Sequence, residues 1–369
     1  MPINPSKYLD KAPDIDHIIS QKGLPVPEGT LNAPFEYLQL LPSNNNKVRS
    51  KFLVGFNEKF FHITDTRVIT EIGAVIETLH GASLLIDDIE DDSTFRRGQP
   101  CAHITCGLPA TINSGNLMYF TAMQRALTNL PTYLESTDND SAQAVLRSQL
   151  LDIFMAEMIN LHVGQGFDIY WRDNFLDVMN SGLPSIEEYL EVVMHKTGGL
   201  FRLAVRMLSL FADGMAPNTR LPNKLVQIAS LLGIVYQIRD DYINLADEEY
   251  AELKGSTCED LIEGKMSLPI LYTLIHQGKS SPLFQLYREA KSPEERRADV
   301  GRLEAVSKFI ADSGALEYSY SILQEYVQKA KALIESEGDD SSNILSDILT
   351  KLSIVGTERK RPAKASFLH

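Results

Sequence analysis

The chain has few cysteines, a single tryptophan and no excess of positive charge. Its 369 residues include 3 cysteines (Cys101, Cys106 and Cys258), and the formal net charge is −14. Three cysteines are too few for a disulfide framework, and none has the spacing of a zinc site. We therefore expect free thiols in a reducing, cytoplasmic compartment. The acidic balance argues against a nucleic-acid partner, which requires a basic surface.

The sequence also lacks an obvious targeting or membrane segment. Its first residues, MPINPSKYLDKAPD, have no basic start followed by an apolar run, so we expect no secretory signal. No run reaches the ~20 apolar residues of a transmembrane helix. The longest apolar stretch, LVQIASLLGIVYQI from Leu225, is interrupted by Gln227 and Gln237 and is typical of a buried core helix.

Alternating strand patterns are scarce, and helical periodicity dominates. Residues 65–90 place apolar side chains at Val68, Ile72, Val75 and Leu79, which is the spacing of one helix face. Similar patterns predict helices over residues 111–130, 142–164, 186–211, 221–246, 265–277, 296–312, 315–336 and 342–354. We predict an all-α fold, with one large single-domain helical bundle over residues 31–354.

The two ends differ from this body. Seven of the 17 prolines fall within the first 42 residues, so we expect an extended arm over residues 1–30. Residues 355–369 end in the basic sequence ERKRPAKASFLH. A solvated, disordered tail is the favoured interpretation, with a nuclear signal as the alternative.

An acidic cluster follows the apolar part of the first long helix. The stretch LLIDDIEDDSTFRRG from Leu84 to Gly98 places Asp87 and Asp91 four residues apart, on one face of a helix. Like charges at that spacing repel unless a cation lies between them. Mg²⁺ binds one or two protein carboxylates together with substrate phosphate oxygens. The cluster is therefore interpreted as a phosphate-bridging metal site, with a solvated acidic face as the alternative.

A second cluster and several cations strengthen that interpretation. GIVYQIRDDYINL again ends an apolar run in two aspartates, and its Asp240 and Asn244 lie four residues apart. Two such helices can hold metal ions between them. The chain also offers phosphate-binding cations near its motifs, which are Arg96, Arg97, Lys196 in HKTGG, and Lys265 in EDLIEGKMSLP. Together they predict a pocket for two anionic diphosphates around divalent metal.

With these motifs, the chain resembles the trans-isoprenyl diphosphate synthase family, and within it the eukaryotic geranylgeranyl diphosphate synthases. The matching stretches are LHGASLLIDDIEDDSTFRRGQPCAH, GLPATINSGNLMYF, NLHVGQGFDIYWRD, HKTGGLFRL, LLGIVYQIRDDYINL and CEDLIEGKMSLPI. They run in collinear order over about residues 36–270. The resemblance implies the isoprenoid synthase fold, a helical bundle around a central active-site cavity.

The resemblance also implies a reaction. Isopentenyl diphosphate would condense with dimethylallyl, geranyl or farnesyl diphosphate by ionisation, condensation and elimination, giving geranylgeranyl diphosphate. The alternatives are the fifteen-carbon farnesyl product, a terpene cyclase, and a catalytically silent regulatory subunit. The family forms homodimers, so we expect a homodimer or a larger homo-oligomer.

Residue roles follow from the matched motifs. Asp87, Asp88, Asp91 and Asp240 would hold three Mg²⁺ ions bridging the allylic diphosphate. Its phosphates would be bound by Arg96, Lys196, Lys254 and Lys265. Isopentenyl diphosphate would occupy a metal-free site of Arg49, His80 and Arg97. Thr197 and Gln237 would offer oxygen dipoles near the allylic cation.

The sequence departs from the family at one of these sites. Asn45 and Asn46 in PSNNNKVRSK stand where the family pattern has Gly and Lys, which puts the strength of isopentenyl diphosphate binding in question.

Another group of positions bears on product length. Ala82 and Ser83, one turn before Asp87, are small, so no aromatic residue blocks the growing chain there. By resemblance, Tyr119, Phe120 and His162 would form the floor that stops the product at twenty carbons.

Overall fold

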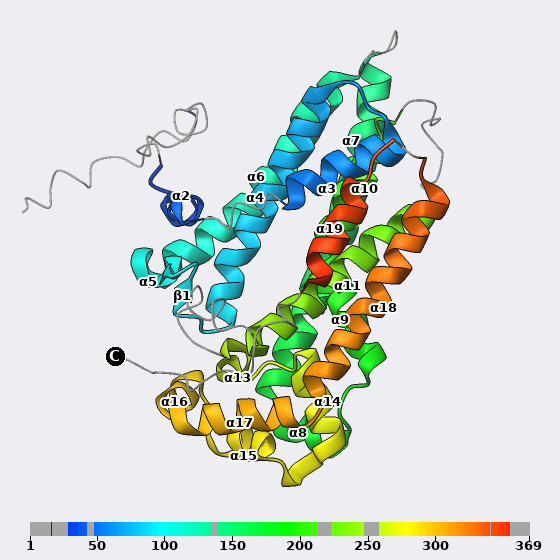
Figure 1. Ribbon diagram of the computed structural model, residues 1–369. Coiled ribbons are helices and arrows are strands. Elements are labelled where there is room, and N and C mark those ends of the chain that lie inside the picture. The colour runs from blue at the N-terminus through cyan, green and yellow to red at the C-terminus, as the bar shows by residue number, and fades with distance from the viewer. Residues whose placement is uncertain are drawn as a thin grey trace, which may run out of the picture.

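The structure is a computed structural model that describes residues 16, 29–42, 48–134, 139–212, 223–246, 258–339 and 341–354. The basic tail and most of the N-terminal arm lie outside these residues. Within them, β1 (Phe95–Arg96) and β2 (Gln99–Pro100) form one short antiparallel pair, and the other regular elements are helices. The predicted all-α class is confirmed (Figure 1).

Helices of very different length build the molecule. The long ones are α4 (Thr66–Glu90), α6 (Leu108–Asn129), α7 (Asn139–Asp173), α11 (Asn223–Ala246) and α18 (Ala315–Glu337). Those of intermediate length are α3 (Val48–Phe56), α9 (Ile186–Lys196), α10 (Gly198–Ser209), α14 (Leu268–Gln277), α17 (Val300–Asp312) and α19 (Ile344–Ser353). The short ones are α2 (Ala33–Leu40), α5 (Ala102–Cys106), α8 (Phe175–Ser181), α13 (Glu259–Glu263), α15 (Pro282–Glu289) and α16 (Pro293–Ala298), with η2 (Asn57–Phe61), η3 (Leu130–Tyr133) and η4 (Gly278–Ser280) as single turns of π- or 3₁₀-helix.

Helix α4 shows how sequence pattern becomes packing. Asp65 caps its first turn by accepting a hydrogen bond from the amide of Arg67. The apolar positions that predicted the helix, including Val68, Ile72 and Val75, are all buried. The helix is long and apolar enough to cross a membrane by length and composition, with 44% of its most apolar window buried inside the protein. Because that face packs against α6 and α10, we interpret α4 as a core helix.

Two segments that were each predicted to be one continuous helix are interrupted in the structure. The single helix expected over residues 186–211 is broken at Thr197 into α9 and α10. The helix expected over residues 296–312 begins earlier, at Pro293, and is interrupted at Asp299 between α16 and α17. Ser292 and Glu295 form a capping box at the start of α16.

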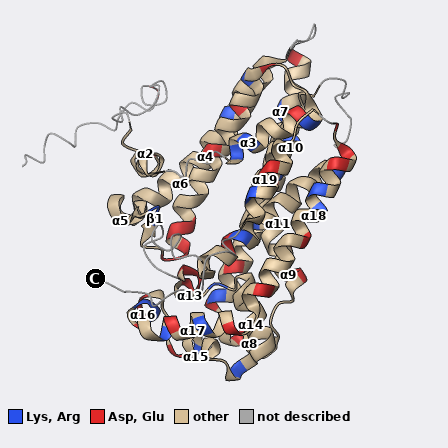
Figure 2. Cartoon of the chain, viewed as in Figure 1, with Lys and Arg blue, Asp and Glu red and all other residues tan. Residues whose placement is uncertain are grey.

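Two apolar clusters form most of the core. The larger one joins α3, α4, α6, α7, α10, α11, α18 and α19. The second joins α8, α13, α14, α15 and α17 around Trp171 and Leu261. Polar contacts link the carboxyl-terminal ends of α4, α7, α9 and α11 to one another and to the α13–α14 segment. Acidic residues gather at the lower end of α4 in Figure 2, and that end carries the candidate site.

Candidate active site

The first aspartate cluster occupies the last turn of α4. The Asp87 and Asp91 side chains are 25% and 13% exposed, whereas Asp88 is 1% exposed. The carboxyl end of a helix attracts cations, because its free carbonyl groups carry partial negative charge. Two carboxylates added there make a strongly cation-attracting position.

Three basic side chains neutralise these aspartates. Lys196 Nζ lies 3.4 Å from Asp87 Oδ1, and Arg172 Nη1 lies 2.7 Å from Asp91 Oδ1. Arg96 Nε donates to Asp88 Oδ1 at 2.7 Å. Each cation comes from a different part of the chain, so the cluster depends on the tertiary fold.

The charges shift the ionisation of the two outer aspartates in opposite directions. Burial disfavours charged Asp87, but Lys196, Arg96 and Lys265 outweigh it and lower its pKa to about 2. Burial and the neighbouring Asp87 raise the pKa of Asp91 to about 7. The pKa of Lys196 is raised, because Asp168 and Asp87 more than offset the effect of its burial. The pKa of Asp87 therefore lies well below neutral pH, while that of Asp91 lies near it.

The second aspartate motif lies at the end of α11. Asp240 is half-buried, whereas Asp241 is 1% exposed. Asp241 accepts hydrogen bonds from the Tyr189 hydroxyl, from Gln237 Nε2 at 2.8 Å and from the amide of Leu268 at 2.9 Å. It is therefore a structural acceptor, and Asp240 has the more accessible carboxylate of the pair.

Other polar residues predicted near this motif divide between the site and the scaffold. The Thr197 hydroxyl donates to Gln237 Oε1 at 2.7 Å, which joins α10 to α11 beside the motif. Lys265 Nζ lies 3.7 Å from Asp241 Oδ1. Asn244 Oδ1 instead accepts a hydrogen bond from the amide of Asp260 at 3.0 Å, so its side chain links α11 to α13.

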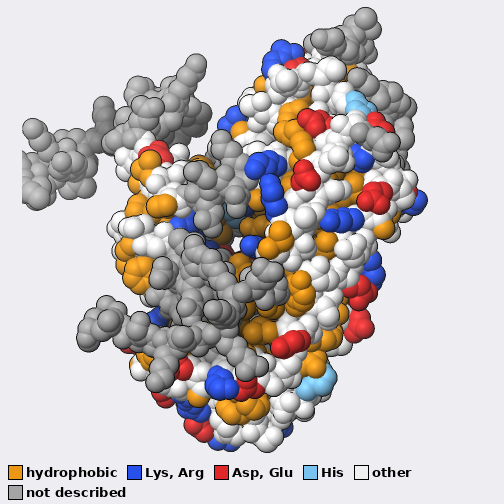
Figure 3. Space-filling model, in the orientation of Figure 1, with side chains coloured by type: hydrophobic (Ala, Val, Ile, Leu, Met, Phe, Trp, Pro, Cys, Tyr) orange, Lys and Arg blue, Asp and Glu red, His pale blue; other side chains and the backbone are white. Residues whose placement is uncertain are grey.

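The structure brings Arg49, His80 and Arg97 within electrostatic reach of one another. Burial, Arg49 and Arg97 lower the pKa of His80 well below its usual value. Burial, Arg49 and Arg96 likewise lower the pKa of Arg97. Arg49 Nε is paired with Glu77 Oε1 at 3.0 Å. Figure 3 shows this face hollowed between the half that holds α4 and the half that holds α19, with basic side chains at the rim.

The residues expected to set product length do not all come together. Ala82 is fully buried, and the half-buried Ser83 donates its hydroxyl to the His80 carbonyl at 2.8 Å. The Tyr119 and His162 rings meet edge to face, with centroids 5.8 Å apart. Phe120 is 66% exposed. His162 is exposed as well, so a floor formed by Tyr119, Phe120 and His162 stays a prediction.

Three polar residues of α7 that were not predicted to be functional contact the acidic cluster or its lysine. Asp168 Oδ2 accepts a hydrogen bond from Lys196 Nζ at 2.7 Å. Gln165 donates to Glu90 at 2.8 Å, and Arg172 pairs with Asp91. The signal was their spacing in GQGFDIYWRD, because positions three and four residues apart share one helix face.

The described residues contain no group of three or more His, Cys, Asp or Glu side chains arranged to hold a metal ion. Asp87 and Asp91 supply carboxylate oxygens from one face of α4. That donor set fits Mg²⁺ if substrate phosphates complete its coordination.

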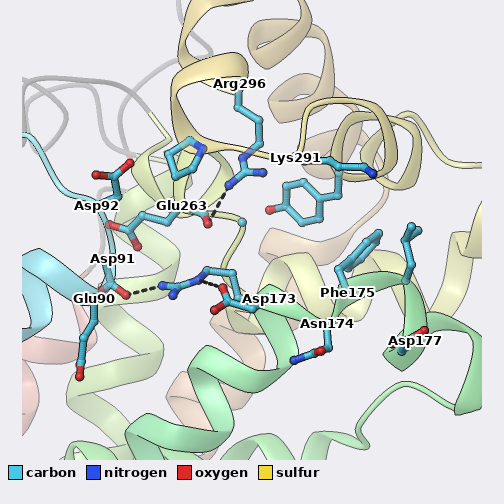
Figure 4. Close-up of a pocket in the computed structure, with 15 residues that line it drawn as sticks. Glu90, Asp91, Asp92, Asp173, Asn174, Phe175, Asp177, Glu263, Lys291 and Arg296 are labelled. Carbon is cyan, nitrogen blue, oxygen red and sulfur yellow. Dashed lines mark hydrogen bonds and ion pairs between the residues drawn. The ribbon is translucent and has the colours of Figure 1, made fainter.

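A pocket of about 580 Å³ is lined in part by the Arg172–Asp91 pair. Figure 4 shows Asp91 and Asp92 on one wall and Phe175 on the opposite wall. A separate small pocket is lined by Asp168, Tyr189, Lys196, Thr197, Gln237, Asp241 and Lys265, among others.

Lys254, Asn45 and Asn46 lie outside the described residues, so their expected roles remain predictions.

Comparison with known proteins gives one consistent result. The polyprenyl synthetase family model matches residues 29–302. The chain is 32% identical to a geranylgeranyl pyrophosphate synthase of Fusarium fujikuroi over 96% of this chain and 75% of the relative. It is 37% identical to one of Eremothecium gossypii over 87% of this chain and 93% of the relative. It is 38% identical to one of Aspergillus versicolor over 89% and 77%. The resemblance drawn from the aspartate, arginine and lysine motifs is therefore confirmed, and the chain belongs to the polyprenyl synthetase family.

Proposed function

We propose that this chain is a prenyltransferase that makes geranylgeranyl diphosphate from isopentenyl diphosphate and an allylic diphosphate. The observation that carries the proposal is the meeting of Asp87, Lys196 and Asp168, which come from three helices, at the end of α4. The relatives described above all bear the name of this activity. Dimethylallyl, geranyl and farnesyl diphosphates are the proposed allylic substrates.

Magnesium is the proposed metal. Asp87, Asp91 and Asp240 are the carboxylates that would hold it, in up to three ions once the allylic diphosphate is bound. When bound, Mg²⁺ would supply Lewis-acid stabilisation of the leaving diphosphate. Asp88 is a weaker candidate ligand, since its carboxylate is buried and already engaged by Arg96.

The side chains of the chain have separate tasks in this proposal. Arg96, Lys196 and Lys265 bind the allylic diphosphate, whose carbon–oxygen bond breaks with the electron pair leaving on the diphosphate. Arg49, His80 and Arg97 hold isopentenyl diphosphate so that its double bond attacks the allylic carbon and forms the new carbon–carbon bond. The released diphosphate accepts the proton lost from the adduct. The oxygens of Thr197 and Gln237 stabilise positive charge on the allylic fragment.

The proposed assembly is a homodimer. Helix α7 carries an exposed apolar stripe of Met155, Ile159, Val163 and Phe167, each between 42% and 57% exposed. A contiguous apolar surface of this kind marks an interaction site. A second copy of the chain is the partner that the family resemblance favours.

A cytoplasmic location is proposed as well. It is supported by the three cysteines, all of which are free.

The proposed function is tested by product analysis. Purified protein is incubated with Mg²⁺, radiolabelled isopentenyl diphosphate and each allylic diphosphate in turn, and the dephosphorylated products are separated by chain length. The twenty-carbon alcohol should dominate with all three substrates. A fifteen-carbon product would identify a farnesyl diphosphate synthase. The absence of product with every substrate would favour a silent subunit.

A further inference from the structure

A buried ion pair outside the proposed reaction joins α7 to the start of α10. Glu157 is 3% and Arg202 is 7% exposed. Arg202 Nη2 lies 2.8 Å from Glu157 Oε2, and its Nε lies 3.0 Å from the same oxygen. Neither residue has a role in the chemistry proposed above, so the reason for burying two charges must lie elsewhere.

Arg202 reaches past its ion-pair partner to the end of the preceding helix. Its Nη1 donates to the carbonyl of Met194 at 2.7 Å. Met194 lies in the last turn of α9, where carbonyl groups lose their intrahelical donors because the helix ends. Arg202 therefore caps α9 from within α10 and bridges the break at Thr197.

Three glycines allow neighbouring groups to close on this break. A Cβ atom at Gly198 would lie 2.7 Å from Arg202 Nη1. One at Gly164 of α7 would lie 2.5 Å from the amide nitrogen of Lys196, and one at Gly233 of α11 would lie 2.6 Å from the Gly198 Cα. The α9–α10 break is thus in close contact with both α7 and α11.

The break lies between two residues of the candidate site and their partners on other helices. Lys196 ends α9 and points to Asp87 and Asp168. Thr197, at the break itself, points to Gln237. Their aim depends on how α9 and α10 are joined.

We propose that the Glu157–Arg202 pair is a positioning device that holds the α9–α10 break and so aims Lys196 and Thr197 at the reacting diphosphate. The inference rests on the proposed function and deepens it by adding two positioning residues. Neither residue contacts substrate. A displacement of about 1 Å at a site of this kind costs up to roughly a hundredfold in rate.

The test compares two arginine-to-methionine variants. Arg202→Met removes the cap on Met194 but leaves Glu157 paired with Arg206, whose Nη1 lies 3.2 Å away. The matched control is Arg125→Met, which breaks a second ion pair, Glu71–Arg125, with Nε 2.6 Å from Oε1. That pair joins α4 to α6 and contacts no candidate site residue.

The expected result separates position from stability. Arg202→Met should lower kcat/KM for the allylic diphosphate by roughly tenfold to a hundredfold, with the KM for isopentenyl diphosphate unchanged. Arg125→Met should lose thermal stability but keep its activity per folded molecule. Hydrogen exchange in a peptide spanning residues 190–200 should accelerate in Arg202→Met and stay at the parent rate in Arg125→Met.

A second variant guards against a misfolded Arg202→Met protein. Gly198→Ala places a methyl group against Arg202 Nη1 without removing any charge, and it should reproduce the same selective loss and the same faster exchange. Equal activity losses in Arg202→Met and Arg125→Met, or unchanged exchange over residues 190–200 in both Arg202→Met and Gly198→Ala, would overturn the inference. If the parent protein makes no prenyl product, the proposed function fails. The exchange measurement still tests whether the Glu157–Arg202 pair holds the α9–α10 break.

Discussion

Lys196 lies between Asp87 and Asp168, with its Nζ 3.4 Å from the first carboxylate and 2.7 Å from the second. In the protein without substrate, this lysine neutralises the position that metal and diphosphate would occupy. Binding of both would let Lys196 turn from the carboxylates to a phosphate oxygen. The same exchange is open to Arg96, which is held by Asp87 and Asp88.

Removing the Asp87 carboxylate should abolish most activity without unfolding the protein. Asp87→Ala deletes a proposed metal ligand, so transition-state stabilisation should fall by several kcal/mol, which is a rate loss of roughly a thousandfold or more. Steady-state kinetics and circular dichroism measure the two effects. Asp312→Ala, at an exposed pair with Lys308, serves as the control. Activity of Asp87→Ala within tenfold of the parent would contradict the metal assignment.

Metal binding should strengthen as the pH rises through about 7. In the folded protein the pKa of Asp91 is raised from 3.8 to about 7, while that of Asp87 is lowered to about 2. Asp87 therefore stays ionised over this pH range. Mg²⁺ requires the carboxylate form, so it must displace the Asp91 proton below pH 7. In the metal-free protein, the folded state holds the Asp91 proton over a pH range in which the unfolded state has lost it. The free energy of unfolding should therefore fall as the pH rises from about 4 to 7.

The measurement is the Mg²⁺ concentration at half-maximal activity between pH 6 and 8. Asp91→Asn corrects for ionisation of the substrates themselves, since it has no proton to lose at this position. If the parent and Asp91→Asn show the same pH dependence, Asp91 does not titrate in this range.

Arg97 should affect one substrate more than the other. Arg97→Leu removes a cation beside Arg49 and His80, so the KM for isopentenyl diphosphate should rise by about tenfold to a hundredfold, which corresponds to a charge-assisted hydrogen bond of about 1.5–3 kcal/mol. The KM for the allylic diphosphate should stay nearly constant. Arg96→Leu should show the reverse pattern. Equal effects of each variant on both substrates would argue against two separate diphosphate sites.

Tyr119 should control product length more strongly than Phe120 does. Tyr119→Ala removes the ring that packs on His162, and it should shift part of the product to twenty-five carbons or more, with a stability cost of up to about 3 kcal/mol. Phe120→Ala changes an exposed ring and should retain more of the twenty-carbon product. Chromatography of the dephosphorylated alcohols separates these outcomes. A Tyr119→Ala protein that still stops at twenty carbons would place the floor elsewhere.

Charge on the α7 stripe should break the proposed homodimer. Ile159→Glu places a carboxylate at a side chain that is 57% exposed, so a dimer that buries it should dissociate. Light scattering after size-exclusion chromatography gives the mass. Ile275→Glu, at a residue 41% exposed on α14, is the matched control and should keep the parent's mass. A dimeric Ile159→Glu protein would exclude the stripe as the main interface.

The sequence was enough to predict the fold class and the protein family. Apolar residues at helical spacing specify α4 and α11 because each buries one face whatever its neighbours are. The aspartates that end both helices, with Arg96, Arg97 and Lys196, predicted a diphosphate site from the sequence alone. Local pattern carries this information because it depends on residues a few positions apart.

Tertiary structure alone decided which aspartate of each pair is the more exposed and where α9 ends. Asp87 and Asp88 are adjacent in sequence, but they project from the helix about 100° apart, and packing buries one of them against Arg96. The same holds for Asp240 and Asp241. The break at Thr197 depends on Arg202, Glu157 and the close approach of Gly164 and Gly233. These contacts join distant segments, and the periodicity of residues 186–211 gave no sign of them because a local pattern records only its own helix.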